Sequence, residues 1–105
     1  MSYRIIFSPE AENQLIALYH YIATEASPSI ASHYIDSIIS YCEGFSTSPH
    51  RGTMRDDIRP GLRITNYKRH AVIAFDVVED LVSIIGIFYG GQDYKTALSD
   101  ASDVG

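Results

Sequence analysis

Cysteine and tryptophan are nearly missing from this 105-residue chain, which has one cysteine and no tryptophan. A single cysteine cannot form an internal disulfide, and it excludes a zinc site built from clustered cysteines. Proteins with so little cysteine are typical of reducing compartments. We therefore expect the protein to be cytoplasmic.

Long hydrophobic runs are also missing. The longest apolar stretch, residues 81–89, is far too short to cross a bilayer and contains Ser83. No basic leader followed by an apolar run stands at the start of the chain, so we expect no secretory signal and no membrane partner.

Positive charge is scarce, and it is concentrated in one segment. The net charge of −5 argues against direct, sequence-specific binding of nucleic acid. Residues 51–70 nevertheless hold six of the eight basic residues against two acidic ones, while the rest of the chain holds eleven acidic residues. This asymmetry predicts either a localised anionic partner or a loop whose charges pair internally.

The composition is that of one globular domain, with 46% apolar and 20% charged residues. We place a single domain at residues 1–98 and expect residues 99–105 to form a flexible tail. Residues 3–7 are β-branched and aromatic and predict a strand. Ser8-Pro9 and Ser27-Pro28 are helix-start signals. They predict a helix over about 9–25 and a second one that ends near Gly44, packed as an antiparallel hairpin.

The second half of the chain predicts a sheet. Residues 46–61 contain two prolines and two glycines, so we expect a loop there. Strands are predicted over 62–67, 71–77 and 81–89, joined by hairpin turns at 68–69 and 79–80. A short turn or helix is expected over 92–98. The predicted fold is α+β, in the order β-α-α-β-β-β, with the helical hairpin packed on a mainly antiparallel sheet.

Arginines recur every four residues at positions 51, 55, 59 and 63. They would share one face of a helix, but Pro60 and Gly61 argue against a helix here. One interpretation is a basic patch that meets phosphate or a carboxylate-rich protein surface. The other is that Asp56 and Asp57 pair with Arg59 and Arg63 and tie the loop to the sheet.

A second basic group, Lys68-Arg69-His70, lies at the predicted turn. With Tyr67 and Tyr94 it has the side chains of a nucleic-acid contact, cations for phosphate and rings for stacking, although a solvated turn has the same composition. His70 is a candidate general base without a second histidine or a paired acid in the sequence.

The remaining titratable residues show no cofactor or metal pattern. The other three histidines lack the spacing of metal ligands, and His20 and His33 are predicted at the surface of their helices. Cys42 lies on the apolar side of the second helix and is predicted to be a buried structural thiol.

Some apolar residues lie outside the main stripe of the first helix. Ile16, Ala17 and Tyr21 would widen its apolar surface and favour binding of an amphipathic helix from a partner. Scattered exposed apolar residues are also common on protein surfaces, so the pattern alone leaves both interpretations open.

Taken in order along the chain, these segments resemble the ParE toxins of bacterial toxin–antitoxin modules. The resemblance covers about residues 3–98 and is carried by residues 7–11 (FSPEA), 21–23 (YIA), 27–28 (SP), 49–52 (PHRG), 55–63 (RDDIRPGLR) and 86–94 (GIFYGGQDY). It implies a cytosolic toxin that forms a hetero-oligomer with a cognate antitoxin, whose flexible C-terminal part folds on binding. It also implies DNA gyrase as the target, inhibited by binding without a catalytic residue or a cofactor.

The related RelE toxins give the alternative, a ribosome-dependent mRNA endoribonuclease. Those enzymes carry basic and acid–base side chains on the strands that match 71–77 and 81–89 here. This chain has alanine, phenylalanine and glycine in those places, a departure that argues against RNA cleavage.

Two sets of candidate binding residues follow. The candidates for target binding are Arg59, Arg63, Tyr67, Lys68, Arg69 and Tyr94. The candidates for antitoxin binding are Ile16, Ala17 and Tyr21.

Overall fold

Two serine–proline pairs start the two helices as the sequence predicts. A computed structural model describes residues 2–90, 94, 95, 97 and 98. Helix α1 spans Pro9–Glu25 and helix α2 spans Pro28–Glu43, followed by the 3₁₀ turn η1 at Gly44–Ser46. The hydroxyl of Ser8 accepts a hydrogen bond from the amide of Ala11 at 3.0 Å, and that of Ser27 accepts one from Ile30 at 3.1 Å. Both bonds satisfy amides that a helix start leaves free.

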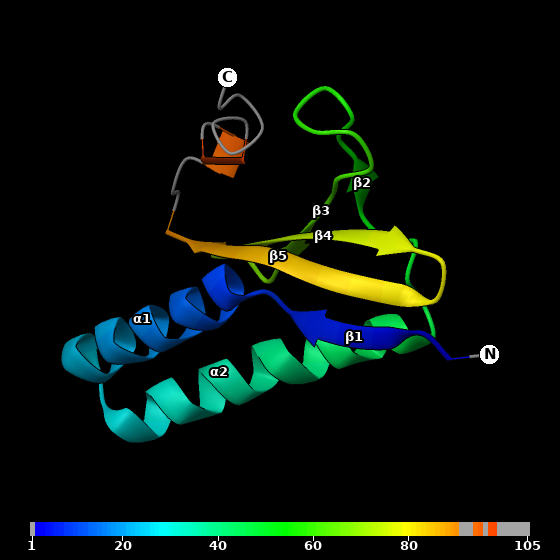
Figure 1. Cartoon of the computed structure of the whole chain (residues 1–105). Coiled ribbons are helices and arrows are strands. Elements are labelled where there is room, and N and C mark those ends of the chain that lie inside the picture. Colours follow the sequence, from blue (N-terminus) through cyan, green and yellow to red (C-terminus); the bar gives the residue numbers. More distant parts are fainter. Residues whose placement is uncertain (1, 91–93, 96, 99–105) are drawn as a thin grey trace.

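The strands form one mixed sheet on which the helices pack (Figure 1). Its strands are β1 (Arg4–Phe7), β2 (Thr53–Met54), β3 (Arg63–Tyr67), β4 (Ala71–Val78) and β5 (Leu81–Tyr89). The strand order is β1-β5-β4-β3-β2, in which β1 pairs parallel with β5 and all other pairs are antiparallel. The predicted α+β class and the predicted hairpin turns are confirmed.

Strand β2 corrects one prediction, because it lies within the segment expected to be a loop. Thr53 and Met54 pair with Ile64 and Arg63. Two residues are too few to produce an alternating pattern, so the neighbouring turn residues dominate the local sequence. Gly52 precedes the strand with φ 81°, and a Cβ there would lie 2.5 Å from the carbonyl oxygen of Ile64. This close approach of two backbones requires glycine.

A β-bulge in β5 fixes the position of α1. Ala74 pairs with Gly86 and the next residue, Phe75, pairs with Ile84, so Ile85 is the extra residue. Its carbonyl accepts a hydrogen bond from the hydroxyl of Ser8 at 3.0 Å. The serine that starts α1 therefore also joins this helix to the bulge.

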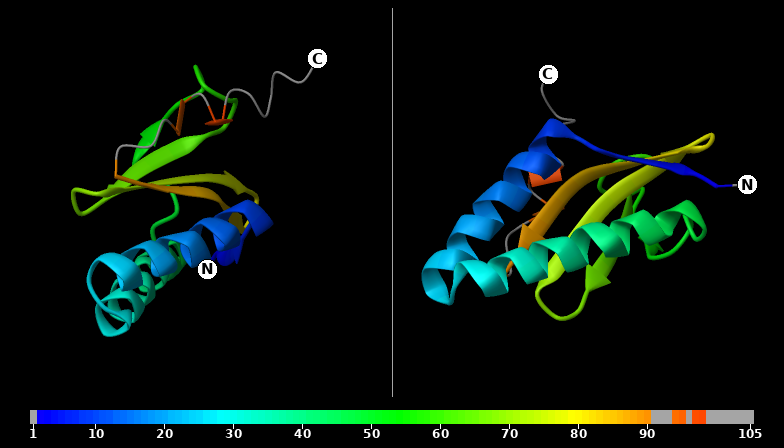
Figure 2. Two further views of the ribbon diagram at one scale, coloured as in Figure 1. Left: turned by 90° about the vertical axis from the view of Figure 1, so that its left-hand side faces the viewer. Right: turned by 90° about the horizontal axis from the view of Figure 1, so that it is seen from below.

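The sheet separates two apolar clusters. On the helical side, residues of α1, α2, β4 and β5 pack around Phe45 and Phe75, both fully buried. The opposite side holds a smaller cluster of Leu62, Ile64, Ala74, Phe88 and Leu98. Residues 94, 95, 97 and 98 are helical and lie over this second side, seen above the sheet in Figure 2, left. The predicted turn over 92–98 is partly described; the predicted flexible tail, 99–105, lies outside the described residues.

Candidate functional site

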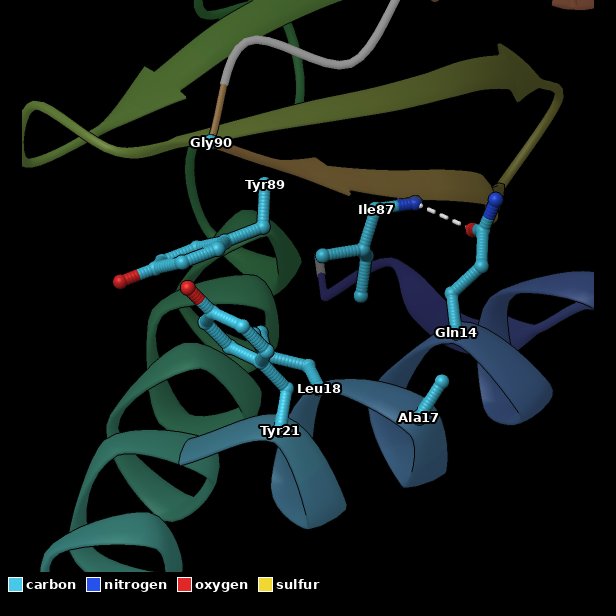
Figure 3. Close-up of a pocket in the computed structure, with 7 residues that line it drawn as sticks. All are labelled: Gln14, Ala17, Leu18, Tyr21, Ile87, Tyr89 and Gly90. Carbon is cyan, nitrogen blue, oxygen red and sulfur yellow. Dashed lines mark hydrogen bonds between the residues drawn. The ribbon is translucent and has the colours of Figure 1, made fainter. Parts of the chain in front are cut away.

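A pocket lies along the seam between α1 and β5, and we call it the seam pocket (Figure 3). Its volume is about 350 Å³, and it is lined by Gln14, Ala17, Leu18, Tyr21, Ile87, Tyr89 and Gly90. The four residues from α1 recur at helical spacing, so one face of the helix forms one wall. Ile87 and Tyr89 of β5, with Gly90 directly after the strand, form the other wall.

The seam pocket exists because β1 covers only part of the β5 edge. β1 pairs with residues 81–84, and beyond them the side chain of Gln14 takes over. Its Oε1 accepts a hydrogen bond from the amide of Ile87 at 2.6 Å, drawn in Figure 3. A side chain thus satisfies an edge amide that a further strand would otherwise bind.

A second depression, the interhelical groove, lies on the other side of α1. It has a volume of about 690 Å³ and is lined by Phe7, Glu12, Asn13, Leu15, Ile16, Tyr19, Ile35 and Ile39. The two helices diverge from their turn, and β1 crosses at the open end, as Figure 2, right, shows. The groove is therefore bounded by both helices and by Phe7 of β1.

The three antitoxin-binding candidates divide between the two depressions. Ile16, which is 57% exposed, lines the interhelical groove. Ala17 and Tyr21 line the seam pocket, and Tyr21 is 56% exposed. Apolar surface therefore continues around α1 from one depression to the other, as a surface for a large apolar partner requires.

The six target-binding candidates do not form one surface, because the sheet separates them. Tyr67 lies on the helical side, where its ring packs against Tyr34 at 6.1 Å and Tyr41 at 4.9 Å between centroids. Burial of the Tyr34 hydroxyl raises its pKa, with smaller contributions from Tyr89 and Tyr67. Tyr67 is half-buried in a row of tyrosines formed by Tyr34, Tyr41, Tyr67 and Tyr89.

Arg63 lies on the same side of β3 as Tyr67 and donates to the backbone. Its guanidinium binds the carbonyl oxygens of His50 at 3.0 Å and Arg51 at 3.4 Å. These bonds hold the segment before β2 against β3.

Arg59 and Tyr94 belong to the opposite side of the sheet. The guanidinium of Arg59 donates to the carbonyl of Leu98 at 3.1 Å. Tyr94 packs on Phe88 with 6.1 Å between ring centroids. Asp76 lies nearby, where burial raises the pKa of its carboxyl and the charge of Arg59 opposes that rise.

The predicted pairing of Asp56 and Asp57 with Arg59 and Arg63 is wrong in its partners. Asp57 accepts two hydrogen bonds from Arg55, at 2.8 and 2.9 Å, and this contact lowers the pKa of Asp57. Asp56 accepts from the amide of Gly61 at 2.7 Å and closes the turn before β3. Both carboxylates therefore bind within the loop. Arg59 and Arg63 instead tie the loop to the rest of the fold through hydrogen bonds to backbone carbonyls.

The turn between β3 and β4 carries exposed basic residues. Lys68, Arg69 and His70 are all exposed. The Lys68 ammonium lies 5.4 Å from the ring centroid of Tyr67, and the His70 ring lies 6.0 Å from that of Tyr89. This turn therefore joins the row of tyrosines to the basic segment.

Cys42, His20 and His33 are placed as the sequence predicts. Cys42 is buried, and burial raises the pKa of its thiol to about 12, so it is protonated and unreactive at neutral pH. His20 and His33 are exposed. Within the part of the chain that the structure describes, no three metal-ligating side chains gather and no helix is long and apolar enough to cross a membrane.

Several lining residues were missed by the sequence interpretation. Gln14 follows the spacing of Ala17 and Tyr21 along α1, a signal that would have revealed it. Tyr89 and Ile87 gave no such signal, because only the folded sheet brings the end of β5 beside α1.

Comparison with known protein families shows the family of this chain, and comparison with solved structures shows its fold. The sequence matches the ParE toxins of type II toxin–antitoxin (ParDE) systems over residues 5–94. The fold is similar to a chain of a chromosomal ParDE system from P. aeruginosa, with a TM-score of 0.74, 19% identity, and coverage of 84% of this chain and 96% of that chain. It is also similar to a chain of the RelBE2 toxin–antitoxin complex from Mycobacterium tuberculosis, with a TM-score of 0.62, 14% identity, and coverage of 86% and 100%. No curated protein sequence matches the chain.

Proposed function

Because the chain belongs to the ParE toxins of type II toxin–antitoxin systems, we propose that it is a cytosolic toxin neutralised by a cognate antitoxin and directed against DNA gyrase. The observation that carries this proposal is the family match over residues 5–94. The similar ParDE and RelBE2 chains both come from toxin–antitoxin systems, which supports a hetero-oligomer.

The apolar surface around α1 is the proposed antitoxin site. Ile16 in the interhelical groove and Ala17 with Tyr21 in the seam pocket are its anchor contacts. A segment that fills both depressions would bury exposed apolar area on two sides of one helix, and such burial is the main favourable term in protein association.

The proposed target contacts lie in two places, at the β3–β4 turn and on the side of the sheet opposite the helices. Lys68 and Arg69 project from an exposed turn, and Tyr94 presents a partly exposed ring. We assign these three direct contacts with the target. We assign Arg59, Arg63 and Tyr67 a positioning role, because Arg59 binds the carbonyl of Leu98, Arg63 binds that of His50, and the Tyr67 ring packs on Tyr41.

The side chains on the side of the sheet opposite the helices support inhibition by binding over RNA cleavage. Ala74 and Phe88 of β4 and β5 are buried there with Leu98 over them. A ribonuclease needs cations around the scissile phosphate and an acid–base pair. Ala74 and Phe88 supply neither, although Arg59 and Asp76 lie on the same side of the sheet. RNA cleavage of the RelE type remains the alternative, favoured by the similarity to the RelBE2 chain.

Growth of a bacterial host tests the proposal. The chain is expressed alone and together with the product of the neighbouring open reading frame, which we expect to be the antitoxin. We expect growth arrest in the first culture and normal growth in the second. Equal growth of both cultures, with folded protein present in each, would refute the toxin assignment.

Primer extension on mRNA from the arrested culture separates the two mechanisms. Inhibition of gyrase predicts no new cleavage sites. Ribosome-dependent cuts that disappear in the His70→Ala variant would establish the ribonuclease.

A further inference from the structure

The helical layer carries negative charge and no lysine or arginine. Between Arg4 and Arg51 the chain has none of either residue. The same stretch has five carboxylates, all exposed: Glu10, Glu12, Glu25, Asp36 and Glu43. In the described part of the chain the ion pairs are Arg4–Asp80 and Arg55–Asp57, so none of these five is neutralised by a salt bridge there.

Part of this charge lies at the larger apolar depression. Glu12 itself lines the interhelical groove, and Asp36 follows the groove residue Ile35 in α2. The apolar lining residues Leu15, Ile16 and Tyr19 face Ile39 and Ile35 across the groove. An occupant must therefore be apolar at its centre and compatible with carboxylates at its rim.

The shape of the groove favours a helix as occupant. It runs between two helices, and each wall supplies side chains spaced one turn apart, at residues 15 and 19 in α1 and 35 and 39 in α2. An amphipathic helix presents its apolar side chains at the same spacing and fills such a groove.

We propose that the interhelical groove binds a cationic amphipathic helix, with apolar residues on one face and lysine or arginine beside them. This inference rests on the proposed function, because the occupant is taken to be a segment of the antitoxin. It adds the chemistry of that segment, which should be basic because it binds the acidic helical layer. The target of the basic segment 51–70, by contrast, is expected to be anionic. The toxin would thus bind its two partners through surfaces of opposite charge.

Complementary charge at the rim acts on association rate and specificity. Rim carboxylates attract a basic segment at low salt and repel an acidic one. Apolar contacts at the centre are not screened by salt, so they determine the affinity that remains at high salt.

Two synthetic peptides of about 18 residues test the proposal, long enough to form a helix in the groove. They share one leucine–alanine face and differ only in flanking residues, lysine in one and glutamate in the other. Fluorescence anisotropy measures binding to the full chain at about 50 mM and about 0.5 M salt. We expect the lysine peptide to bind at least about tenfold more tightly than the glutamate peptide at low salt, with a smaller difference at high salt.

Three variants locate the binding site. Glu12→Gln is expected to weaken the lysine peptide by about two- to fivefold at low salt. Glu79→Gln, at the distant β4–β5 turn, removes the same charge and should leave binding unchanged. Ile16→Ala should weaken binding at both salt concentrations by about tenfold or more.

Several results would overturn the proposal. They are equal or tighter binding of the glutamate peptide, no binding of either peptide, and binding of the lysine peptide that Ile16→Ala does not change. The growth experiment remains independent. If the neighbouring gene product neutralises the chain but Glu12→Gln leaves their complex unchanged at low salt, the charge inference fails and the toxin assignment stands.

Discussion

Replacement of Ser8 by alanine should destabilise the fold about twice as much as the same change at Ser27. Both serines start a helix and accept one amide hydrogen bond, from Ala11 and Ile30. Loss of such a cap costs about 1 kcal/mol. Ser8 also donates to the carbonyl of Ile85, and loss of this bond adds about 1 kcal/mol. We therefore expect about 2 kcal/mol for Ser8→Ala and about 1 kcal/mol for Ser27→Ala.

Urea denaturation followed by circular dichroism measures both free energies of unfolding. In thermal melts, each kcal/mol corresponds to a shift of about 4–8 °C for a domain of this size. Ser40→Ala, at an exposed position within α2, is the control and should cost nothing measurable. Equal losses for Ser8→Ala and Ser27→Ala would refute the role of the Ile85 bond in joining α1 to the bulge.

Three further predictions concern the backbone at Gly52, the thiol of Cys42 and the carboxyl of Asp76. Gly52→Ala should destabilise the fold by about 2 kcal/mol or more, because a Cβ there meets the Ile64 carbonyl. Gly61→Ala, where φ is nearly the same but no atom lies within 4 Å of the Cβ, should cost about 1 kcal/mol in the same urea assay. Cys42 should react with Ellman's reagent only after unfolding, and rapid reaction of the native protein would contradict its burial. Asp76→Asn should raise the melting temperature at pH 7, because burial raises the pKa of this carboxyl and its charge therefore destabilises the fold. The gain in melting temperature should vanish as the pH falls below the pKa of the carboxyl in the unfolded chain. A gain that grows toward acid pH would contradict this prediction.

The helices were predictable because their signals are local. Each begins at a serine–proline pair, and the buried stripe runs for about three turns, from Ala11 to Ile22 in α1 and from Ala31 to Cys42 in α2. The strands β3, β4 and β5 were predictable from β-branched residues and from turns at Lys68 and Glu79, both of which have positive φ in the structure. Strand β2 was not, because two residues give no periodicity.

The binding residues were predictable only in part. Ile16, Ala17 and Tyr21 stand outside the main stripe of α1, and their exposure follows from helical geometry. The side of the sheet on which each candidate lies was harder to predict. Alternation along β3 does not say which face the helices cover, so Tyr67 and Arg59 were grouped although the sheet separates them.

Ion-pair partners were also beyond the sequence. Four arginines and two aspartates within thirteen residues allow several pairings of similar spacing. The chain path decides among them, because Asp56 is used by the amide of Gly61 and Asp57 by Arg55.

A supercoiling assay with purified gyrase tests the central claim most directly. The chain is added to gyrase and relaxed plasmid, with and without the product of the neighbouring gene. We predict that the chain blocks supercoiling, that the antitoxin restores it, and that Lys68→Ala, Arg69→Ala or Tyr94→Ala weakens the inhibition while leaving antitoxin binding intact. Normal supercoiling in the presence of folded chain, at concentrations that arrest growth in cells, would contradict the gyrase assignment.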